Sequence, residues 1–490
     1  MKIYDTMSGK KKEFKPIEDG KVKMYACGVT VYDLCHIGHA RQAIVYAMIA
    51  DYLRYRGYDV TYVRNYTDVD DKIIKRANEQ GKGALELSKE QIKEAEIDME
   101  NLHVKSADYN TKASEYIEKI IKFIEKLIEK GNAYKAENGD VYFAVRTFKE
   151  YGKLSHRNVD DMLNGVRIEL EEGKRDPIDF ALWKSAKPGE VYWESPWGKG
   201  RPGWHIECSV MAEDTLGESI DIHGGGRDLQ FPHHENEIAQ SEALTGKPLA
   251  NYWTHCGLIK INGEKMSKSL GNSLTIRDAV KMYNYEAIKY LMFSKNYESD
   301  IDISDSDFQI AESHLYYFYT TIKEMQKYIE QNKNEEITDI LEDDISKDII
   351  PNFINVMDDD FNTASAISYL YGIFKYVNNA MKTAKKGNKA KAANTLENIL
   401  KNVKEVYGVL GLFKQEPEKI IAELKEKYLN KLDISKTYIE EQITKRLEAK
   451  KERNFELADK IRAELDEKGI ILNDTVNGTT WDVKALYKIS

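Results

Sequence analysis

A short apolar strand, a loop that carries glycine, a helix and a second apolar strand follow one another near the start of the chain. The first strand is predicted over 22–26, the helix over 39–56 with Gly57 as its natural end, and the second strand over 58–63. Two buried strands joined through a helix form the βαβ unit of nucleotide-binding folds. We therefore predict an α/β fold in which a Rossmann-type parallel sheet occupies the first part of the chain.

The rest of the chain divides into regions with different patterns. Helical spacing of apolar residues covers 83–131, whereas 141–200 is irregular and contains several prolines and tryptophans. A glycine-rich turn is predicted over 217–226, and a helix from about Pro232 follows it. The pattern over 305–413 is helical almost throughout, which predicts a separate helical region.

The chain has 490 residues, which is too long for one hydrophobic core. Its last part begins with helical spacing and ends with strand-like residues on both sides of a turn at Asn477 and Gly478. The predicted domains are 1–110 and 203–304 for the two halves of the Rossmann-type domain, 111–202 for an insertion between them, 305–415 for an all-helical bundle, and 416–490 for a small mixed α/β domain.

The composition is 42% hydrophobic and 31% charged, and no apolar run approaches the ~20 residues that span a bilayer. The chain starts without an apolar leader, so we expect a cytoplasmic protein with no membrane partner. The net charge of −10 argues only weakly against a nucleic-acid partner, because surface charges act over about 8 Å at physiological salt. Basic residues gather over 382–391 and 445–453, where they either face solvent or bind a polyanion.

Four cysteines are spread over the chain, at Cys27, Cys35, Cys208 and Cys256. In a reducing compartment they are thiols or metal ligands rather than disulfides. The absence of a C-x-x-C pair excludes a local zinc finger but leaves open a metal site that the fold assembles. By spacing alone, buried structural cysteines are the simpler interpretation.

The segment His36-Ile37-Gly38-His39 lies where the first loop meets the predicted helix. A helix N-terminus attracts phosphate through its unpaired N–H groups and the positive end of its dipole. His36 and His39 share one face of the first turn, and Gly38 allows a base or sugar to approach the backbone. The two imidazoles could stabilise charge on a phosphoryl group, although the segment alone also fits an ordinary helix start.

A second polar element is Lys265-Met266-Ser267-Lys268-Ser269, which has glycines on both sides. Small residues and glycines predict a loop, and two lysines three residues apart can close over a pyrophosphate leaving group. Alone, the element fits a lysine-rich surface loop equally well.

Together and in this order, the two elements resemble the HIGH and KMSKS motifs of class I aminoacyl-tRNA synthetases. The segments around them resemble cysteinyl-tRNA synthetases over nearly the whole chain. The matching segments are Tyr25–Asp33, Arg64–Lys72, Gly203–Ser209, His223–Leu229, Phe231–Glu237, Asp360–Thr363 and Ala458–Trp481.

The resemblance implies one zinc ion per chain in the amino-acid pocket, with the ligands Cys27, Cys208, His233 and Glu237. His233 and Glu237 are four residues apart on the predicted helix and therefore share a face. Two thiolates, an imidazole and a carboxylate suit zinc. His234 points about 100° away from His233 on an ideal helix, so we expect it to support the structure or the ligands. A pocket that recognises only the shape of an amino acid discriminates between similar side chains by only ~1–3 kcal/mol. Because zinc can select a thiol, no editing domain is expected.

The resemblance also implies roles for other residues. The catalytic residues would be His36, His39, Lys265 and Lys268. ATP would be bound by Thr30, His36, Gly38, His39, Asp228, Lys265, Ser267 and Lys268. The cysteine pocket would contain Cys27, Gly28, Thr67 and Trp204. Two of these assignments have simpler alternatives, because Trp204 could be a core residue and Asp228 a turn carboxylate instead of a ribose ligand.

The implied reaction joins L-cysteine to cysteine tRNA through a cysteinyl-adenylate made from ATP, with Mg²⁺ on the phosphates. We expect the helical bundle and the C-terminal domain to bind tRNA, the latter at the anticodon, and the protein to be a monomer. Three alternatives stay open. The first is a cysteine-activating ligase with a small amine acceptor, but such ligases generally lack the C-terminal tail. The second is a non-catalytic tRNA-binding paralogue, which would tend to lose the motifs. The third is a general nucleotidyltransferase, which needs neither the zinc ligands nor the tail.

Overall fold

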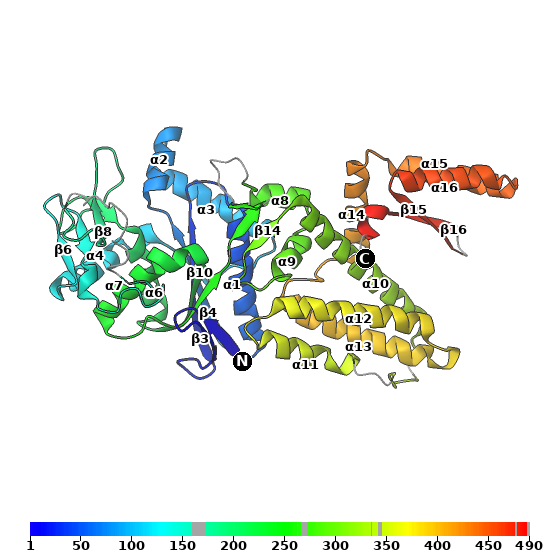
Figure 1. Ribbon diagram of the computed structural model, residues 1–490, viewed down its shortest axis with the longest axis horizontal. Helices are drawn as coiled ribbons and strands as arrows, with labels where there is room; N and C mark the ends of the chain where they lie inside the picture. Colours follow the sequence, from blue (N-terminus) through cyan, green and yellow to red (C-terminus); the bar gives the residue numbers. More distant parts are fainter. Residues whose placement is uncertain are drawn as a thin grey trace. The chain divides into compact units, whose positions relative to one another are not determined.

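The computed structural model describes residues 1–158, 173–261, 263–265, 273–334, 336–341, 345–475 and 478–487 (Figure 1). The chain forms two compact units. Unit 1 comprises Met1–Ala279, Lys295–Asp302 and Met357–Asn362. Unit 2 comprises Val280–Ser294, Ile303–Val356 and Thr363–Ser490.

A five-stranded parallel sheet forms the centre of unit 1 (Figure 1). Its order is β11 (Ala250–Cys256), β10 (Ile220–Gly226), β3 (Lys21–Thr30), β4 (Asp59–Thr67) and β5 (Tyr109–Lys112). The chain runs from β3 outward to β5 and later returns on the other side of β3. The strand order therefore reverses between β3 and β10. In α/β sheets, ligands bind beside the carboxyl ends of the strands at such a reversal. This sheet confirms the predicted Rossmann-type class.

The predicted βαβ unit is present, with helix α1 (Ile37–Tyr55) between β3 and β4. The pairing of β3 with β4 shifts register between Ala26 and Val29. Gly28 lies in this irregular stretch, and a Cβ atom there would be 1.6 Å from the carbonyl oxygen of Asn65. Only glycine allows the two strands to approach so closely at this point.

The prediction of continuous helical structure over 83–131 is wrong. Helix α3 (Ala84–Asn101) ends well before α4 (Ile117–Glu129), and the edge strand β5 lies between them. β5 is short and carries the polar residues Tyr109-Asn110-Thr111-Lys112. Its conformation is set by backbone pairing with β4 rather than by its own apolar pattern.

The predicted glycine turn over 217–226 is also wrong, because 220–226 forms the buried strand β10. A Cβ atom at Gly224 would lie 2.3 Å from the ring of Tyr46. The Tyr46 hydroxyl bonds to the carbonyl oxygens of Gly225 and Thr254, at 2.9 and 2.8 Å. The glycines are therefore needed for close packing against α1 and not for a turn.

The backbone is extended at Phe231, which makes a kink there, and the predicted helix from about Pro232 follows this kink and continues as α7 (Glu235–Thr245). On the N-terminal side of β10 the chain forms α6 (Trp204–Leu216). α6 and α7 pack against each other, and α6 also packs against β3 and β4. This arrangement brings 204–208 and 233–237 to the same part of the sheet.

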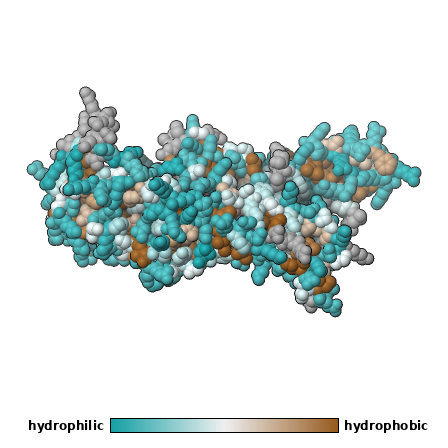
Figure 2. Space-filling view, turned by 60° about the horizontal axis from the view of Figure 1, so that its bottom comes forward, coloured by the Kyte–Doolittle hydropathy of each residue, from teal (hydrophilic) through white to brown (hydrophobic). Residues whose placement is uncertain are grey.

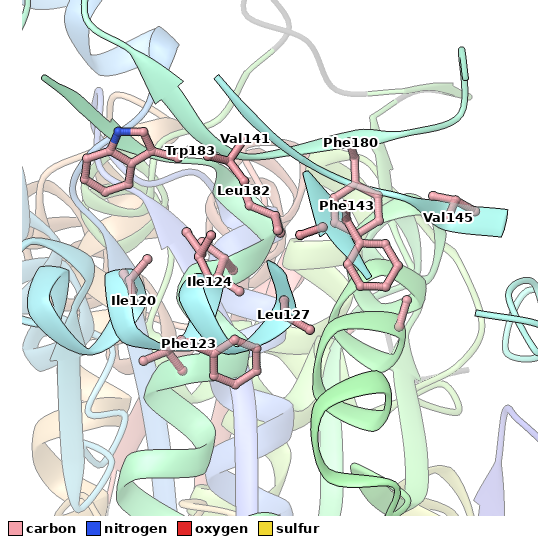
Figure 3. Packing of buried hydrophobic residues seen from close by; sticks show 14 of the residues in the cluster. Ile120, Phe123, Ile124, Leu127, Val141, Phe143, Val145, Phe180, Leu182 and Trp183 are labelled. Carbon is pink, nitrogen blue, oxygen red and sulfur yellow. The ribbon is translucent and has the colours of Figure 1, made fainter. Parts of the chain in front are cut away.

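The irregular insertion contains an antiparallel sheet of β6 (Ala133–Lys135), β7 (Val141–Phe143), β8 (Phe180–Ser185) and β9 (Gly200–Pro202), in that order. Figure 3 shows Ile120, Phe123, Ile124 and Leu127 of α4 beneath this sheet. Their spacing of three and four residues places them on one helix face. The same core includes Ile206 and Val210 of α6, so the insertion shares its core with the helix that follows it.

Unit 2 is mostly helical, as predicted (Figure 1). Its principal helices are α9 (Tyr285–Phe293), α10 (Asp305–Asn332), α11 (Ile345–Met357, whose last residue belongs to unit 1), α12 (Thr363–Thr383), α13 (Lys389–Val409), α14 (Pro417–Lys431), α15 (Lys436–Lys451) and α16 (Phe455–Glu467). The chain then forms the predicted hairpin from β15 (Ile470–Thr475) and β16 (Gly478–Val483).

One basic residue of the C-terminal part neither faces solvent nor is available to a polyanion. Arg446 is buried, and its Nη1 and Nη2 atoms donate to the Asp474 carboxylate at 2.8 and 2.9 Å. The prediction that the basic residues over 445–453 face solvent or bind a polyanion is therefore wrong for Arg446. Lys445, Lys451 and Arg453 are exposed and keep that interpretation.

Hydrophilic residues dominate the face of the molecule in Figure 2. Within the part of the chain that the structure describes, no helix has both the length and the apolar character needed to cross a membrane.

Candidate active site

A cavity of about 310 Å³ lies at the carboxyl ends of β3, β4 and β10, beside the N-terminus of α1. This is the position that the reversal of strand order predicts for a ligand site. Eleven of the predicted site residues line this cavity: Cys27, Gly28, Thr30, His36, Gly38, His39, Thr67, Trp204, Cys208, Asp228 and His233.

The first turn of α1 is held by its own two histidines. His36 is the N-cap residue, and its Nδ1 accepts a hydrogen bond from the Gly38 N–H at 3.1 Å. The Nδ1 of His39 accepts from the His36 N–H at 3.3 Å, and the two rings stack with centroids 3.7 Å apart. This reciprocal capping fixes both imidazoles at the helix N-terminus, where a phosphate group is favoured.

The second polar element begins at Lys265, whose backbone pairs with Lys260 in a short antiparallel ladder. Met266, Ser267, Lys268 and Ser269 lie outside the described residues, and so does the side chain of Lys265. The chain that follows is described, and it pairs with the loop of His36. The Ile37 N–H donates to Leu274 O at 2.9 Å, and the Ile276 N–H donates to Cys35 O at 3.0 Å. The two distant motifs are therefore tied together through the backbone at 274–276.

The predicted metal ligands come together in the buried wall of the cavity. The Cys27 Sγ lies 3.7 Å from the Cys208 Sγ and 3.3 Å from Glu237 Oε1, and His233 Nε2 lies 3.0 Å from the same oxygen. One donor atom from each of the four residues lies within 4.8 Å of the others. A tetrahedral zinc site with bonds of about 2.0–2.3 Å has donor–donor edges of about 3.3–3.8 Å, so the spacing fits such an ion.

The charges in this cluster also suit a cation. Burial would raise the pKa of Cys208, but a hydrogen bond with Cys27 and the positive charge of His233 lower it to about 6. Burial would likewise lower the pKa of His233, but Glu237 and Cys208 raise it to about 10. Burial opposes ionisation of Glu237, yet His223 and His233 hold its pKa well below the ordinary value. Metal binding requires a thiolate, a neutral imidazole and a carboxylate, so a bound cation would take the place of the proton on His233.

A second group of buried donors overlaps the first: Cys27, His223, His234 and Glu237. His223 Nε2 lies 2.8 Å from Glu237 Oε2, and His234 Nδ1 lies 2.8 Å from His255 Nε2. His223 and His234 are not among the residues that line the cavity, whereas Cys27, Cys208 and His233 are. The predicted group therefore has three of its four residues on the cavity, whereas the second group has only Cys27 there.

Trp204 is a wall of the cavity rather than a core residue. Its ring stacks on His233 with centroids 4.3 Å apart and an angle of 21°. Thr67 also lines the cavity, and its hydroxyl oxygen accepts from the Asn65 side chain at 3.4 Å. Asp228 lies in a 3₁₀ turn (Arg227–Leu229) after β10, on the cavity surface, where a ribose or a simple turn could both use it.

Three polar residues of this region had no role assigned from the sequence. His205 Nδ1 lies 2.9 Å from His233 Nδ1 and so can hold the orientation of that ring. His223 contacts Glu237, as described above. Glu207 is fully buried, and burial together with the neighbouring Cys208 sulfur raises its pKa well above the ordinary range. The sequence offered only a local signal, because Glu207 is next to Cys208, His223 is next to Gly224 and His205 is next to Trp204. Spacing of this kind does not show which side chains meet.

Comparisons with known proteins agree with this geometry. The family "tRNA synthetases class I (C) catalytic domain" matches residues 13–313, and the DALR domain family matches residues 352–414. A cysteine–tRNA ligase of Geobacter metallireducens is 48% identical over 488 residues, covering 99% of this chain and 100% of the relative. A cysteine–tRNA ligase of Thermodesulfovibrio yellowstonii is 47% identical over 489 residues, with the same coverage of both chains.

Solved structures show the same fold at low sequence identity. Mycobacterium tuberculosis methionyl-tRNA synthetase bound by methionyl-adenylate superposes with a TM-score of 0.63 at 14% identity, covering 82% of this chain and 93% of that one. Agrobacterium radiobacter LeuRS, in a ternary complex with tRNA and LeuAMS, gives a TM-score of 0.58 at 10% identity over 84% of this chain and 88% of that one. The full-length identity and the catalytic-domain match show that this chain belongs to the cysteine–tRNA ligase family of class I aminoacyl-tRNA synthetases.

Proposed function

We propose that the protein joins L-cysteine to cysteine tRNA in two steps at one site. The cysteine carboxylate attacks the α-phosphorus of ATP, which forms cysteinyl-adenylate and releases pyrophosphate, and the terminal ribose of the tRNA then takes the cysteinyl group. The observation that carries the proposal is the juxtaposition of Cys27, Cys208, His233 and Glu237 with the capped histidines of α1 in one cavity. A thiol-selective cluster beside a phosphate site fits cysteine activation.

Cys27, Cys208, His233 and Glu237 would hold one zinc ion. Bound there, zinc would supply a coordination position for the substrate thiolate, which neither serine nor alanine can fill comparably. The chain itself orients the ligands: the second nitrogen of His233 meets His205, and the second oxygen of Glu237 meets His223. Trp204 stacks on His233 and closes one side of the cysteine pocket.

His36 and His39 would stabilise the charge that develops on the phosphoryl group during adenylate formation. Their rings are already fixed by reciprocal capping, so little reorganisation is needed. Thr30, Gly38 and Asp228 would contact ATP along the same wall. Lys265, Ser267 and Lys268 would approach the phosphates from the second motif, with Mg²⁺ bound to ATP.

We assign tRNA binding to the helical bundle over 305–415 and to the domain over 416–490, the latter at the anticodon. The DALR match within the bundle and the exposed lysines of α15 support this assignment.

We also propose the domain boundaries of the catalytic part as predicted, at 1–110, 111–202 and 203–304. A monomeric state and a cytoplasmic location are part of the same proposal.

Aminoacylation with a defined acceptor tests the proposal against its rivals. The purified protein, with radiolabelled cysteine and ATP, should charge cysteine tRNA and should not transfer cysteine to small amines. Transfer to an amine without charging of tRNA would support the small-molecule ligase. Tight tRNA binding without any charging would support the non-catalytic paralogue.

A further inference from the structure

The loop that carries His36 is clamped by a segment from far along the chain. His36 and Thr275 form an isolated antiparallel bridge, with one backbone hydrogen bond on each side of it, as described above. One of these bonds uses the Ile37 N–H, which belongs to the first turn of α1. Backbone donors in that turn lack partners inside the helix. The backbone of 274–276 therefore holds the start of α1 in place.

The clamp segment is anchored by the charged side chain that follows it. Arg277 lies in the first turn of α8 (Ile276–Met282), whose residues up to Ala279 belong to unit 1. Its Nε and Nη2 atoms donate to Asp98 Oδ1 at 3.3 and 3.2 Å, and Nη2 also donates to Glu94 Oε2 at 2.7 Å. Glu94 and Asp98 are four residues apart on α3 and share a face. One arginine thus joins the clamp segment to two acids of α3.

The ion pair between Arg277 and Asp98 is shielded from solvent on the acid side. The Asp98 side chain has no exposed surface, and 28% of the Arg277 side chain is exposed. A buried carboxylate without a counter-charge is costly, so the buried acid favours arrangements that keep Arg277 beside it. Salt also screens such a pair less than it screens two exposed charges. The contact can therefore hold the position of Arg277.

Helix α3 is in turn attached to a strand that carries part of the cavity wall. Ser88 of α3 is buried, and its hydroxyl donates to the Asp68 carbonyl oxygen at 2.7 Å. Asp68 directly follows Thr67, which ends β4 and lines the cavity. α3 therefore connects two sides of the cavity. It holds the end of β4 through Ser88, and it holds the start of α1 through Arg277 and the segment 274–276.

We propose that Arg277 is a positioning residue for His36 and His39 and acts through its ion pair with Asp98. The pair fixes 274–276 against α3, and the backbone bridge carries that position to the first turn of α1. Misplacement of a reacting group by about 1 Å can cost about 10²-fold in rate, so a loosened clamp slows the attack on ATP. The inference deepens the function proposed above and rests on the role given there to the two histidines.

The four-residue metal cluster serves as an internal reference, because other elements hold it. Its residues lie on β3, on α6 and in the segment 233–237, whereas the described hydrogen bonds of the Arg277 side chain lead to α3. Loss of Arg277 should therefore slow adenylate formation and leave the zinc content and the affinity for L-cysteine nearly unchanged. General damage to the fold would lower all three.

The experiment measures single-turnover formation of cysteinyl-adenylate at saturating ATP and L-cysteine, with the zinc-loaded full-length protein. The rate constant reports the positioning of the histidines, and the amplitude reports the fraction of active protein. Arg277→Gln should lower the rate constant about tenfold or more. It should keep the amplitude, the zinc content and, by titration calorimetry, the Kd of L-cysteine within about twofold of the unaltered protein.

Arg54→Gln is the matched control on the same helix. Arg54 also bridges two acids, Asp51 at 3.0 Å and Asp108 at 2.7 Å, and 26% of its side chain is exposed. It lies in the last turn of α1, at the end opposite to His36. Its loss should leave the rate constant within about twofold, and a tenfold fall would show that any such ion pair on α1 has the same effect, which would overturn a specific role for Arg277.

A double-mutant cycle shows whether Arg277 acts through Asp98. Asp98→Asn should lower the rate constant to a similar extent, and the variant with both changes should be no slower than the slower single variant. Losses that multiply in the double variant would overturn the inference. Arg277→Lys carries the test if Arg277→Gln does not fold, because lysine keeps the charge but lacks the planar fork that contacts both acids. An unchanged rate constant in the variant that folds would equally overturn it.

Cysteine-dependent ATP–pyrophosphate exchange by the unaltered protein separates this inference from the proposed function. Its absence would overturn the proposed function. Its presence, with an unchanged rate constant in Arg277→Gln or with equal falls in rate constant, cysteine affinity and zinc content, would overturn the role of Arg277 alone.

Discussion

At the scale of single residues, the cavity depends on side chains that come from three distant segments. Cys27 lies in β3 directly after its regular pairing with β4, and Cys208 lies in α6. His233 lies two residues before α7, and Glu237 lies in its first turn. Their donor atoms stand at distances that fit one tetrahedral ion. A cluster with this geometry should lose its ion when one thiolate is replaced by a weaker ligand.

Cys208→Ser is therefore expected to lose most of its zinc, because a serine hydroxyl is a poor substitute for a thiolate. The measurement is the zinc content of the purified protein after dialysis, by atomic emission. Cys35→Ser is the control, since Cys35 is also buried but belongs to neither donor group. Full zinc occupancy in Cys208→Ser would refute the ligand set and would favour the group with His223 and His234.

The sequence could predict part of this site from spacing. His233 and Glu237 are four residues apart, and the helical start that places them together was visible. Contacts of His205 and His223 could not be predicted, because they depend on how α6 and β10 meet beside α7. The full burial of Glu207 could not be predicted for the same reason, since burial is a property of packing.

At the scale of elements, strands and helices with strong apolar patterns were predicted well, as α1 and the hairpin of β15 and β16 show. The errors fall where tertiary packing overrides local pattern. β5 is polar and exists because β4 offers it a pairing edge, and the glycines of β10 look like a turn but serve close packing on Tyr46. Such cases cannot be read from propensity alone.

The hairpin offers a test at this scale, because Asp474 of β15 holds the buried Arg446 of α15. Asp474→Ala should weaken this region by about 1–2 kcal/mol, allowing for the partial exposure of Asp474. Hydrogen–deuterium exchange of the β15 and β16 amides should then be about tenfold faster at neutral pH. Exchange as slow as in the unaltered protein would show that the pair contributes nothing.

The same pair predicts a pH dependence. The hydrogen bond with Arg446 lowers the pKa of Asp474 below its ordinary value. The stabilisation is therefore complete above the unfolded pKa of about 3.9 and is lost as the pH falls through the lower folded value. Unaltered protein and Asp474→Ala should thus differ most near neutral pH and converge in acid.

At the scale of the whole molecule, the proposal divides the work between activation in unit 1 and tRNA binding in unit 2. Lys445 and Lys451 of α15 are exposed, and phosphate contacts by such lysines contribute affinity that salt weakens. The double substitution Lys445→Glu and Lys451→Glu should reduce kcat/KM for tRNA about tenfold and leave ATP–pyrophosphate exchange unchanged.

The matched control reverses two exposed lysines of α3 in unit 1, Lys89→Glu and Lys93→Glu, and changes the net charge equally. Charging should be affected much less by this control, because the proposal gives those lysines no contact with tRNA. Equal losses in both variants would point to a general effect of charge and would contradict a specific tRNA surface on α15.

The central claim is that one cavity activates cysteine with ATP and selects it by its thiol. ATP–pyrophosphate exchange with each of the twenty amino acids, without tRNA, measures this most directly. The account predicts exchange with cysteine and none above background with serine or alanine. Exchange with another amino acid, or with none, would contradict it.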